Sequence, residues 1–414
     1  MTSPPILLAC SAALALHLAC AKSESQAPAT PTPTAAACPD VAASAVSPSA
    51  ALARTPPMGW NSWNRFGCNV SETLIRQAAD AIVSSGMKDA GYEFVVMDDC
   101  WQTTRDASGA IVADPQRFAS GMKALADYVH SRGLKLGLYS DAGTQTCGGR
   151  PGSKCFEVAD ARQYAAWGVD YLKFDWCNTD GMTAPEAYAK MRRALDAAGR
   201  PIVFSICEWG SSQPWRWARG IGHLWRTTGD IADCWDCERQ YSRGWLKLLD
   251  QQVGLESYAG PGGWNDPDML EVGNGGMTTA EYRAHFSLWC LLAAPLMAGN
   301  DVSAMSAEIR EILTNKEVIA VDQDALGKQG TRIRDDGDLE VWAKDLSDGA
   351  KAVVLFNRGT AAASLTVSWT ELGMRAGASL KVRDLWTKDD LGVFTGSYGA
   401  QVPPHDVVMV RVQN

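Results

Sequence analysis

Tyr171-Leu172-Lys173-Phe174-Asp175-Trp176-Cys177-Asn178 is a short apolar, aromatic-rich segment that ends in a carboxylate between two aromatic rings. Its composition predicts a β-strand. In a parallel α/β barrel, residues at the carboxyl ends of the strands point into the mouth of the active site, so Asp175 is a candidate catalytic residue. A single loop Asp more often caps a helix or holds a turn, and Asp175 alone does not decide between these roles.

The same pattern, a short apolar strand followed by an acid, recurs five more times along the chain. The acids that follow these strands are Asp98 with Asp99, Asp141, Glu208, Asp230 and Asp268. Segments with helical periodicity separate the strands. Strand and helix repeated about eight times predict an α/β fold, a (β/α)8 TIM barrel, with a ring of carboxylates at one end. Lys173 and Arg226 are expected to join that ring.

The barrel is predicted to span residues 55–328. Its first strand and loop are expected at residues 56–63, after which Ser71 caps the first long helix. A later helix is expected to begin with a capping box formed by Thr183 and Glu186. The short apolar run at residues 318–321 is assigned to the last barrel strand.

Residues 329–414 show a different periodicity. Runs at 339–344 and 365–369 have period-two features, and 407–412 is rich in β-formers, while helical signals are scarce. This region is therefore predicted to be a separate antiparallel β-sandwich domain. We expect it to pack on the barrel and stabilise it.

The N-terminal 54 residues predict export. Residues 6–19 form an apolar run of signal-peptide length, too short to span a bilayer, and Cys20 follows it. We expect residues 1–20 to be a signal peptide of the lipoprotein type, with a lipid anchor at Cys20, and the protein to be periplasmic, on the cell surface or extracellular. Residues 21–54, rich in Ala, Pro, Ser and Thr, are expected to form a disordered tether in which Cys38 has no partner.

Composition excludes some function classes. The net charge of the 414 residues is −9, so the sequence predicts no binding to nucleic acid or to an anionic membrane surface. The five His residues are scattered without metal-ligand spacing, which argues against a zinc site. The 16 Trp outnumber both Tyr and Phe, and such side chains can supply flat platforms for sugars. The sequence does not indicate the oligomeric state.

Two enzyme classes fit a ring of carboxylates with one Lys and one Arg. In glycoside hydrolysis one carboxylate attacks the anomeric carbon and another protonates the leaving oxygen. In a magnesium-dependent lyase or isomerase of the enolase kind, acids bind the metal and Lys173 would be the base. The Trp content, the predicted export, and Trp60 and Trp63 in the first loop favour a sugar substrate.

Six motifs in order resemble glycoside hydrolase family 27, and specifically its melibiase-like α-galactosidases of exported bacterial type. The motifs are Met58-Gly59-Trp60-Asn61-Ser62-Trp63, Met97-Asp98-Asp99-Cys100-Trp101, Lys173-Phe174-Asp175, Cys207-Glu208-Trp209, Trp225-Arg226-Thr227-Thr228-Gly229-Asp230-Ile231 and Trp264-Asn265-Asp266-Pro267-Asp268-Met269-Leu270. The resemblance covers residues 55–414. It implies a (β/α)8 barrel with a C-terminal antiparallel β domain, retaining hydrolysis of terminal α-galactosides, and no metal or organic cofactor.

The resemblance also implies residue roles. Asp175 matches the family's nucleophile and Asp230 its acid and base, which must face each other across one sugar ring. Lys173 is expected to keep Asp175 ionised. Asp98 and Asp99 match the pair that binds the 4- and 6-hydroxyls of galactose. The other residues expected to bind substrate are Trp63, Tyr139, Cys147, Lys173, Cys207, Glu208, Trp209, Arg226, Asp268 and Met269.

Three alternative functions follow from the same residues. A β-L-arabinopyranosidase would alter the acid pair, yet Asp98 and Asp99 are both present. An α-N-acetylgalactosaminidase would need a small residue where Trp209 stands. A non-catalytic galactoside-binding protein would not need both Asp175 and Asp230.

The family pattern implies two disulfides, Cys68 with Cys100 and Cys147 with Cys177. Cys234-Trp235-Asp236-Cys237 departs from the family pattern and is expected to form a local disulfide beside the loop that carries Asp230. Cys155 has no evident partner. Cys290, between apolar residues, is expected to lie in the core.

Overall fold

The structure is a computed structural model that describes residues 38–42, 49 and 51–414. The predicted signal peptide, Cys20 and most of the predicted tether lie outside the described residues. Residues 38–414 form one unit. Within the residues that the structure describes, no helix is both long enough and apolar enough to cross a membrane.

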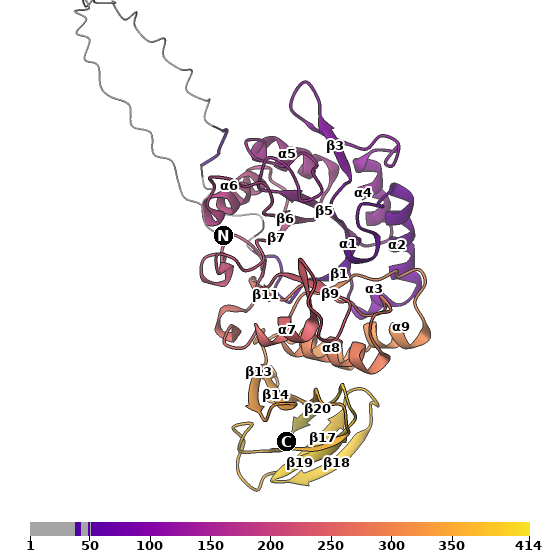
Figure 1. Cartoon of the computed structure of the whole chain (residues 1–414), viewed down its shortest axis with the longest axis vertical. Coiled ribbons are helices and arrows are strands. Elements are labelled where there is room, and N and C mark those ends of the chain that lie inside the picture. The colour runs from indigo at the N-terminus through magenta and orange to yellow at the C-terminus, as the bar shows by residue number, and fades with distance from the viewer. Residues whose placement is uncertain (1–37, 43–48, 50) are drawn as a thin grey trace, which may run out of the picture. The chain divides into compact units, whose positions relative to one another are not determined.

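Eight parallel strands form the barrel predicted from the sequence (Figure 1). Their order along the chain is β1 (Met58–Asn61), β2 (Phe94–Met97), β5 (Lys135–Asp141), β6 (Tyr171–Asp175), β7 (Val203–Ile206), β8 (Leu224–Arg226), β11 (Trp264–Asp266) and β12 (Leu296–Ala298). From β1 to β11 each strand pairs with the next barrel strand along the chain, and β1 pairs with β12. Leu270, just beyond β11, bridges in parallel to Ala298 and so closes the ring.

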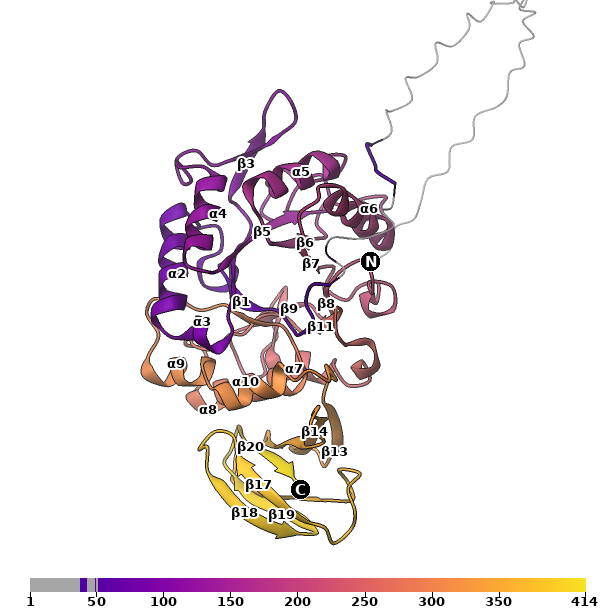
Figure 2. The ribbon, with the colours of Figure 1, turned by 180° about the vertical axis from the view of Figure 1, so that it is seen from behind.

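Helices surround this sheet, as Figure 2 shows from behind. They are α1 (Trp63–Phe66), α2 (Glu72–Ser84), α3 (Met87–Ala90), α4 (Met122–Ser131), α5 (Glu157–Trp167), α6 (Ala184–Ala197), α7 (Trp245–Asp250), α8 (Thr279–Leu291), α9 (Ala307–Leu313) and α10 (Lys316–Asp322), with short 3-10 turns at Pro214–Arg216 and Glu256–Tyr258. Ser71 caps α2 as predicted, because its hydroxyl accepts a hydrogen bond from Leu74 N.

Two local predictions were wrong. Residues 318–321 belong to α10, and the last barrel strand is β12, three buried residues after Pro295. A short apolar run does not distinguish a strand from a buried helix, and Asn315 decides for the helix by accepting hydrogen bonds from Glu317 N and Val318 N. Thr183 is the N-cap residue of α6 but makes no capping hydrogen bond. Its hydroxyl donates instead to the Glu186 side chain, 2.6 Å away.

The C-terminal region is antiparallel, as predicted. Six strands form one sheet in the order β13 (Thr331–Asp335), β14 (Leu339–Asp345), β15 (Lys351–Asn357), β20 (Asp406–Gln413), β17 (Ser379–Asp384) and β18 (Asp390–Thr395), and β16 (Ala363–Ser368) pairs with β19 (Ser397–Val402). Alternate residues of β15 serve two cores. Val353 and Leu355 pack inside the sandwich, while Val354 and Phe356 join the core shared with the barrel helices.

The described part of the predicted tether contacts the barrel. Cys38 forms a disulfide with Cys155, and the Asp40 carboxylate lies 2.6 Å from the Arg193 guanidinium. Ser49 is buried, and its hydroxyl accepts a hydrogen bond from Ile202 N. The expectation that Cys38 and Cys155 lack partners was therefore wrong, because cysteine spacing does not reveal which residues the fold brings together.

Candidate active site

A cavity of about 310 Å³ opens at the carboxyl ends of the barrel strands. All but one of the residues predicted to be catalytic or to bind substrate line it. These residues are Trp63, Asp98, Asp99, Tyr139, Cys147, Lys173, Asp175, Cys207, Trp209, Arg226, Asp230, Asp268 and Met269.

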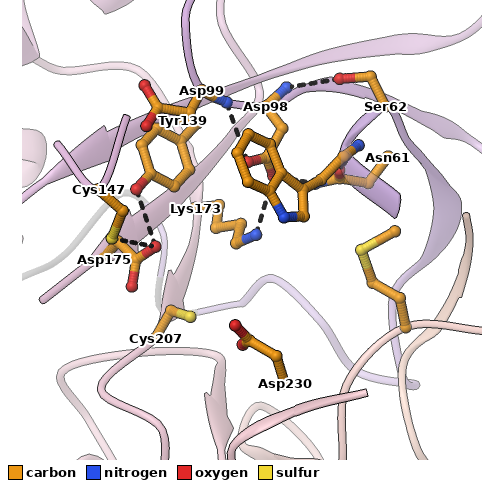
Figure 3. A network of polar contacts seen from close by, with 12 residues as sticks. Asn61, Ser62, Asp98, Asp99, Tyr139, Cys147, Lys173, Asp175, Cys207 and Asp230 are labelled. Carbon is orange, nitrogen blue, oxygen red and sulfur yellow. Dashed lines mark hydrogen bonds and ion pairs between the residues drawn. The ribbon is translucent and has the colours of Figure 1, made fainter. Parts of the chain in front are cut away.

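Asp175 ends β6 and is buried on one side of the cavity (Figure 3). The Tyr139 hydroxyl donates to Asp175 Oδ2 at 2.8 Å, and Trp176 N donates to Oδ1 at 3.0 Å. Burial raises the pKa of Asp175 to about 6, and the Lys173 charge and the Tyr139 hydrogen bond oppose that rise. Asp175 is therefore mostly a carboxylate at neutral pH.

Lys173 and Asp98 form an ion pair inside the site. Lys173 Nζ lies 2.9 Å from Asp98 Oδ2, and Asn61 Nδ2 donates to the same oxygen at 2.7 Å. Burial by itself would lower the pKa of Lys173, but the charges of Asp98 and Asp175 hold it above its ordinary value. The ammonium group is thus fixed in place and charged.

Asp99 is held by backbone donors. Cys100 N donates to Asp99 Oδ1 at 2.6 Å, and Gly148 N donates to Oδ2 at 2.7 Å. A Cβ at Gly148 would lie 2.8 Å from Asp99 Oδ2, so a side chain at this position would collide with the carboxylate. Burial raises the pKa of Asp99. Together with Asp98, it offers two adjacent, preorganised hydrogen-bond acceptors.

Asp230 begins β9 (Asp230–Ala232), beyond the sixth barrel strand. Its carboxyl group points into the same space as that of Asp175 (Figure 3). Arg226 Nη2 lies 2.9 Å from Asp230 Oδ1 and 3.0 Å from Asp268 Oδ2. The Asp230 side chain is 46% exposed, whereas that of Arg226 is 4% exposed. Of the two carboxylates predicted to be catalytic, Asp175 is therefore buried and Asp230 is within reach of solvent.

Glu208 is the exception among the predicted site residues. Cys207 and Trp209 line the cavity, but Glu208, between them, is buried away from it and accepts a hydrogen bond from Ser212 N at 2.6 Å. β7 ends at Ile206, and the chain bends at Glu208 and turns at Trp209, whose φ is 56°, so these three side chains do not share one direction. The expectation that Glu208 contacts substrate is not met by this geometry.

Four residues that line the cavity were not anticipated: Asn64, Ile231, Tyr241 and Ser242. Asn64 directly follows Trp63, and Ile231 directly follows Asp230. Their position beside predicted site residues was the sequence signal that could have identified them. Tyr241 and Ser242 come from a loop that has no periodic pattern. Their approach to the cavity results from the pairing of β10 (Ser242–Gly244) with β9.

Asp141 lies behind the nucleophile candidate, paired in register with Asp175 on the neighbouring strand. It accepts hydrogen bonds from Gly143 N at 2.6 Å and from Cys177 N at 2.8 Å. Burial, together with the charge of Asp175, raises the pKa of Asp141 to about 8. Its hydrogen bonds with Gly143 N and Cys177 N fix the two backbone segments that the Cys147–Cys177 disulfide joins.

The three expected disulfides, Cys68–Cys100, Cys147–Cys177 and Cys234–Cys237, are present. Cys207 and Cys290 are buried free thiols. Within the described residues, Asp141, Cys147 and Cys177 bring metal-ligand atom types together. The two sulfurs are bonded to each other and so offer no thiolate to a metal.

An acid-lined cavity at the carboxyl ends of (β/α)8 strands, with two carboxylates facing one space, is typical of a glycoside hydrolase that uses a carboxylate pair.

Comparisons with known proteins place the chain within that class. Residues 55–324 match the family described as "Alpha galactosidase A", and residues 336–412 match the "Alpha galactosidase C-terminal beta sandwich domain". The chain is 53% identical over 375 residues to "Alpha-galactosidase A" of Cellvibrio japonicus, an alignment that covers 87% of this chain and 92% of the relative. It is 51% identical over 356 residues to an α-galactosidase of Cyamopsis tetragonoloba. This alignment covers 86% of this chain and 85% of the relative.

Among solved structures, α-galactosidase I of Mortierella vinacea matches with a TM-score of 0.85 and 42% identity, covering 88% of this chain and 98% of that one. The chain belongs to the α-galactosidase family of glycoside hydrolases.

Proposed function

We propose that this α-galactosidase releases terminal α-D-galactosyl residues by a double displacement in which Asp175 is the nucleophile and Asp230 is the acid and base. The observation that carries the proposal is that both carboxylates enter one cavity in contrasting surroundings. Asp175 is buried and held by Tyr139, while Asp230 is half exposed beside Arg226. Retaining hydrolysis needs such a division of roles.

In the first step, Asp175 attacks the anomeric carbon as the bond to the glycosidic oxygen breaks. Asp230 donates a proton to that oxygen, and the leaving group departs as an alcohol. The pKa of Asp175, about 6, makes the carboxylate available near neutral pH. Tyr139 and Lys173 keep it oriented and ionised.

In the second step, water attacks the anomeric carbon of the galactosyl ester and frees Asp175. Asp230 gave up its proton in the first step, so its carboxylate accepts the proton of that water. The exposure of Asp230 supports this role because solvent reaches it directly. The galactose released keeps the α configuration.

Asp98 and Asp99 account for the sugar preference. Two adjacent, buried acceptors suit the axial 4-hydroxyl and the 6-hydroxyl of galactose. A sugar that leaves one of these acceptors buried and unpaired would bind less well by about 1–3 kcal/mol. Arabinopyranose lacks the 6-hydroxyl, and Trp209 narrows the space that a 2-acetamido group would need.

The test is hydrolysis of 4-nitrophenyl α-galactoside, with NMR to identify the anomer released first. We expect α-galactose to appear before mutarotation. The rates on the 4-nitrophenyl β-L-arabinopyranoside and α-N-acetylgalactosaminide test the alternative substrates. Faster turnover of either one than of the α-galactoside would contradict the proposed preference for galactose. Binding of galactosides without turnover would indicate the non-catalytic alternative.

We also propose that the chain is exported, with a lipid anchor at Cys20, and that residues 55–328 and 329–414 are its two folded domains. Disulfides such as Cys38–Cys155 support an oxidising compartment. Fractionation of cells that express the wild type or Cys20→Ala tests the anchor. We expect the wild type in the membrane fraction and the variant released from it.

A further inference from the structure

A second cavity, of about 860 Å³, adjoins the inner one. It is lined by Cys147, Cys177, Trp209, Gly229, Asp230, Gln240, Tyr241, Arg243 and Gln251. Asp230 and Tyr241 line both cavities. The residue proposed to protonate the glycosidic oxygen therefore lies on the boundary between the two cavities.

Tyr241 stands out on the wall of the outer cavity. Its side chain is 78% exposed, and it is the most exposed large hydrophobic residue, and the one aromatic among those exposed, in the described part of the chain. Gln240 Nε2 donates to the Tyr241 hydroxyl at 2.8 Å. An exposed aromatic ring beside a cavity presents a flat apolar face on which a sugar ring can stack.

The backbone ties Tyr241 to Asp230. Strand β10 pairs with β9 so that Ser242, the residue after Tyr241, lies opposite Asp230. The loop between these strands contains the Cys234–Cys237 disulfide, and Gly244 N donates to Cys237 O at 2.8 Å. A Cβ on Gly244 would lie 2.7 Å from Cys237 N, so only glycine permits this close approach.

The β domain also supports this loop. The Trp235 ring stacks on His405, with ring centroids 4.4 Å apart and planes 9° apart. His405 lies just before β20, and its Nδ1 lies 2.8 Å from Glu281 Oε1 on α8. Trp235 also packs edge-on against Trp245. The disulfide, Gly244 and His405 thus hold the segment that ends at Tyr241.

We propose that the outer cavity binds the leaving-group side of the substrate, one or more sugar units linked to the terminal galactosyl residue, and that Tyr241 is the platform on which the first of these units stacks. The inference rests on the proposed function, because it needs Asp230 at the glycosidic oxygen. Amide and guanidinium groups of Gln240, Arg243 and Gln251 supply polar partners for sugar hydroxyls. Tyr241 would thereby favour substrates with a sugar leaving group over galactosides with a small aglycone.

The experiment compares two substrates that share the galactosyl group. Methyl α-galactoside places one methyl group beyond the glycosidic oxygen, whereas raffinose places two sugar units there. We expect Tyr241→Ala to lower the ratio of kcat/KM for raffinose to kcat/KM for methyl α-galactoside by about five- to tenfold, mainly through KM. Tyr241→Phe and Tyr241→Trp keep a ring and should hold the ratio within about twofold.

An unchanged ratio in Tyr241→Ala, or equal losses on the two substrates, would overturn the inference while leaving the proposed function intact. Failure of the wild type to hydrolyse methyl α-galactoside and 4-nitrophenyl α-galactoside would overturn the proposed function itself. Inhibition by free galactose gives a second readout. Because galactose occupies the inner cavity, its inhibition constant should change less in Tyr241→Ala than the KM for raffinose.

Discussion

The two sides of the active site differ in how they hold their carboxylates. On the side of the third and fourth barrel strands, Asp175 is 6% exposed, receives the Tyr139 hydroxyl, and lies in register with a second buried acid, Asp141. On the side of the sixth strand, the side chain of Asp230 is 46% exposed and pairs with Arg226. The first side is part of the barrel sheet, whereas on the second side Asp230 begins β9, which pairs with β10 outside the barrel sheet.

This difference separates two physical requirements. A nucleophile must meet the anomeric carbon in one geometry, which favours a rigid, buried strand end. An acid and base must exchange protons with leaving groups and water, which favours exposure.

Asp175→Asn should abolish turnover on every substrate. The amide cannot form the galactosyl ester, so kcat should fall by about 10⁴-fold or more, whatever the leaving group. Steady-state rates on 4-nitrophenyl α-galactoside and raffinose measure this. Substantial activity on either substrate would place the nucleophile elsewhere.

Asp230→Asn should show a loss that depends on the leaving group. A sugar alcohol needs its oxygen protonated, so kcat/KM for raffinose should fall by about 10²- to 10³-fold. Nitrophenolate leaves without that help, so kcat/KM for the nitrophenyl substrate should fall much less. Equal losses on both substrates would contradict the role of Asp230 as general acid.

Tyr139→Phe tests the electrostatics of the buried side. The hydroxyl lowers the pKa of Asp175 by donating to it, so its removal should raise that pKa above about 6. Activity that needs the carboxylate is lost as pH falls through this pKa, and the acidic limb of kcat/KM should therefore move to higher pH. We also expect about a tenfold lower kcat/KM at neutral pH. If the acidic limb of Tyr139→Phe stays at the wild-type pH, the Tyr139 hydroxyl does not lower the pKa of Asp175.

Asp141→Asn should change how stability varies with pH. The pKa of Asp141 is raised from 3.8 to about 8 in the folded state, so the folded protein binds a proton that the unfolded chain has lost between these values. The stability that Asp141 contributes is complete below the lower pKa and is lost as pH rises through the upper one. Relative to the wild type, Asp141→Asn should gain stability as pH rises across this range.

Denaturant unfolding of the wild type and Asp141→Asn near the two ends of that range measures the effect. Asp127→Asn, at an exposed position on α4, is the control that shows how much an Asp→Asn substitution alone changes the stability. A stability difference between wild type and Asp141→Asn that does not vary with pH would show that the buried acid does not titrate as described.

The residues at or just after the barrel strands were predictable from the sequence on both sides, including Asp230 and Arg226, whereas the loop residues Tyr241 and Ser242 were not. Residues 171–175 were predicted as a strand and form β6, because an apolar run ending in Asp is a local pattern. Asp98, Asp99, Tyr139 and Lys173 also follow or lie in such strands, so the barrel geometry brings them together.

The features that were missed depend on contacts between distant segments. Tyr241 reaches the cavity through strand pairing inside a loop, and the Cys38–Cys155 disulfide joins residues 117 positions apart. The short run at 318–321 was misassigned because apolar residues suit a buried helix and a strand equally. Local periodicity identified the strands and their acids, but packing alone determined the loop that completes the site.

Covalent trapping of the galactosyl ester identifies the nucleophile chemically. Brief incubation with 5-fluoro-α-D-galactosyl fluoride, whose galactosyl ester hydrolyses slowly, should leave the fluorosugar bound to the enzyme, and peptide mass spectrometry should locate it on Asp175. The label should be absent from Asp175→Asn. A label on Asp230, Asp141 or any other residue, or active enzyme that never forms an ester, would contradict the assignment of the buried carboxylate as the nucleophile.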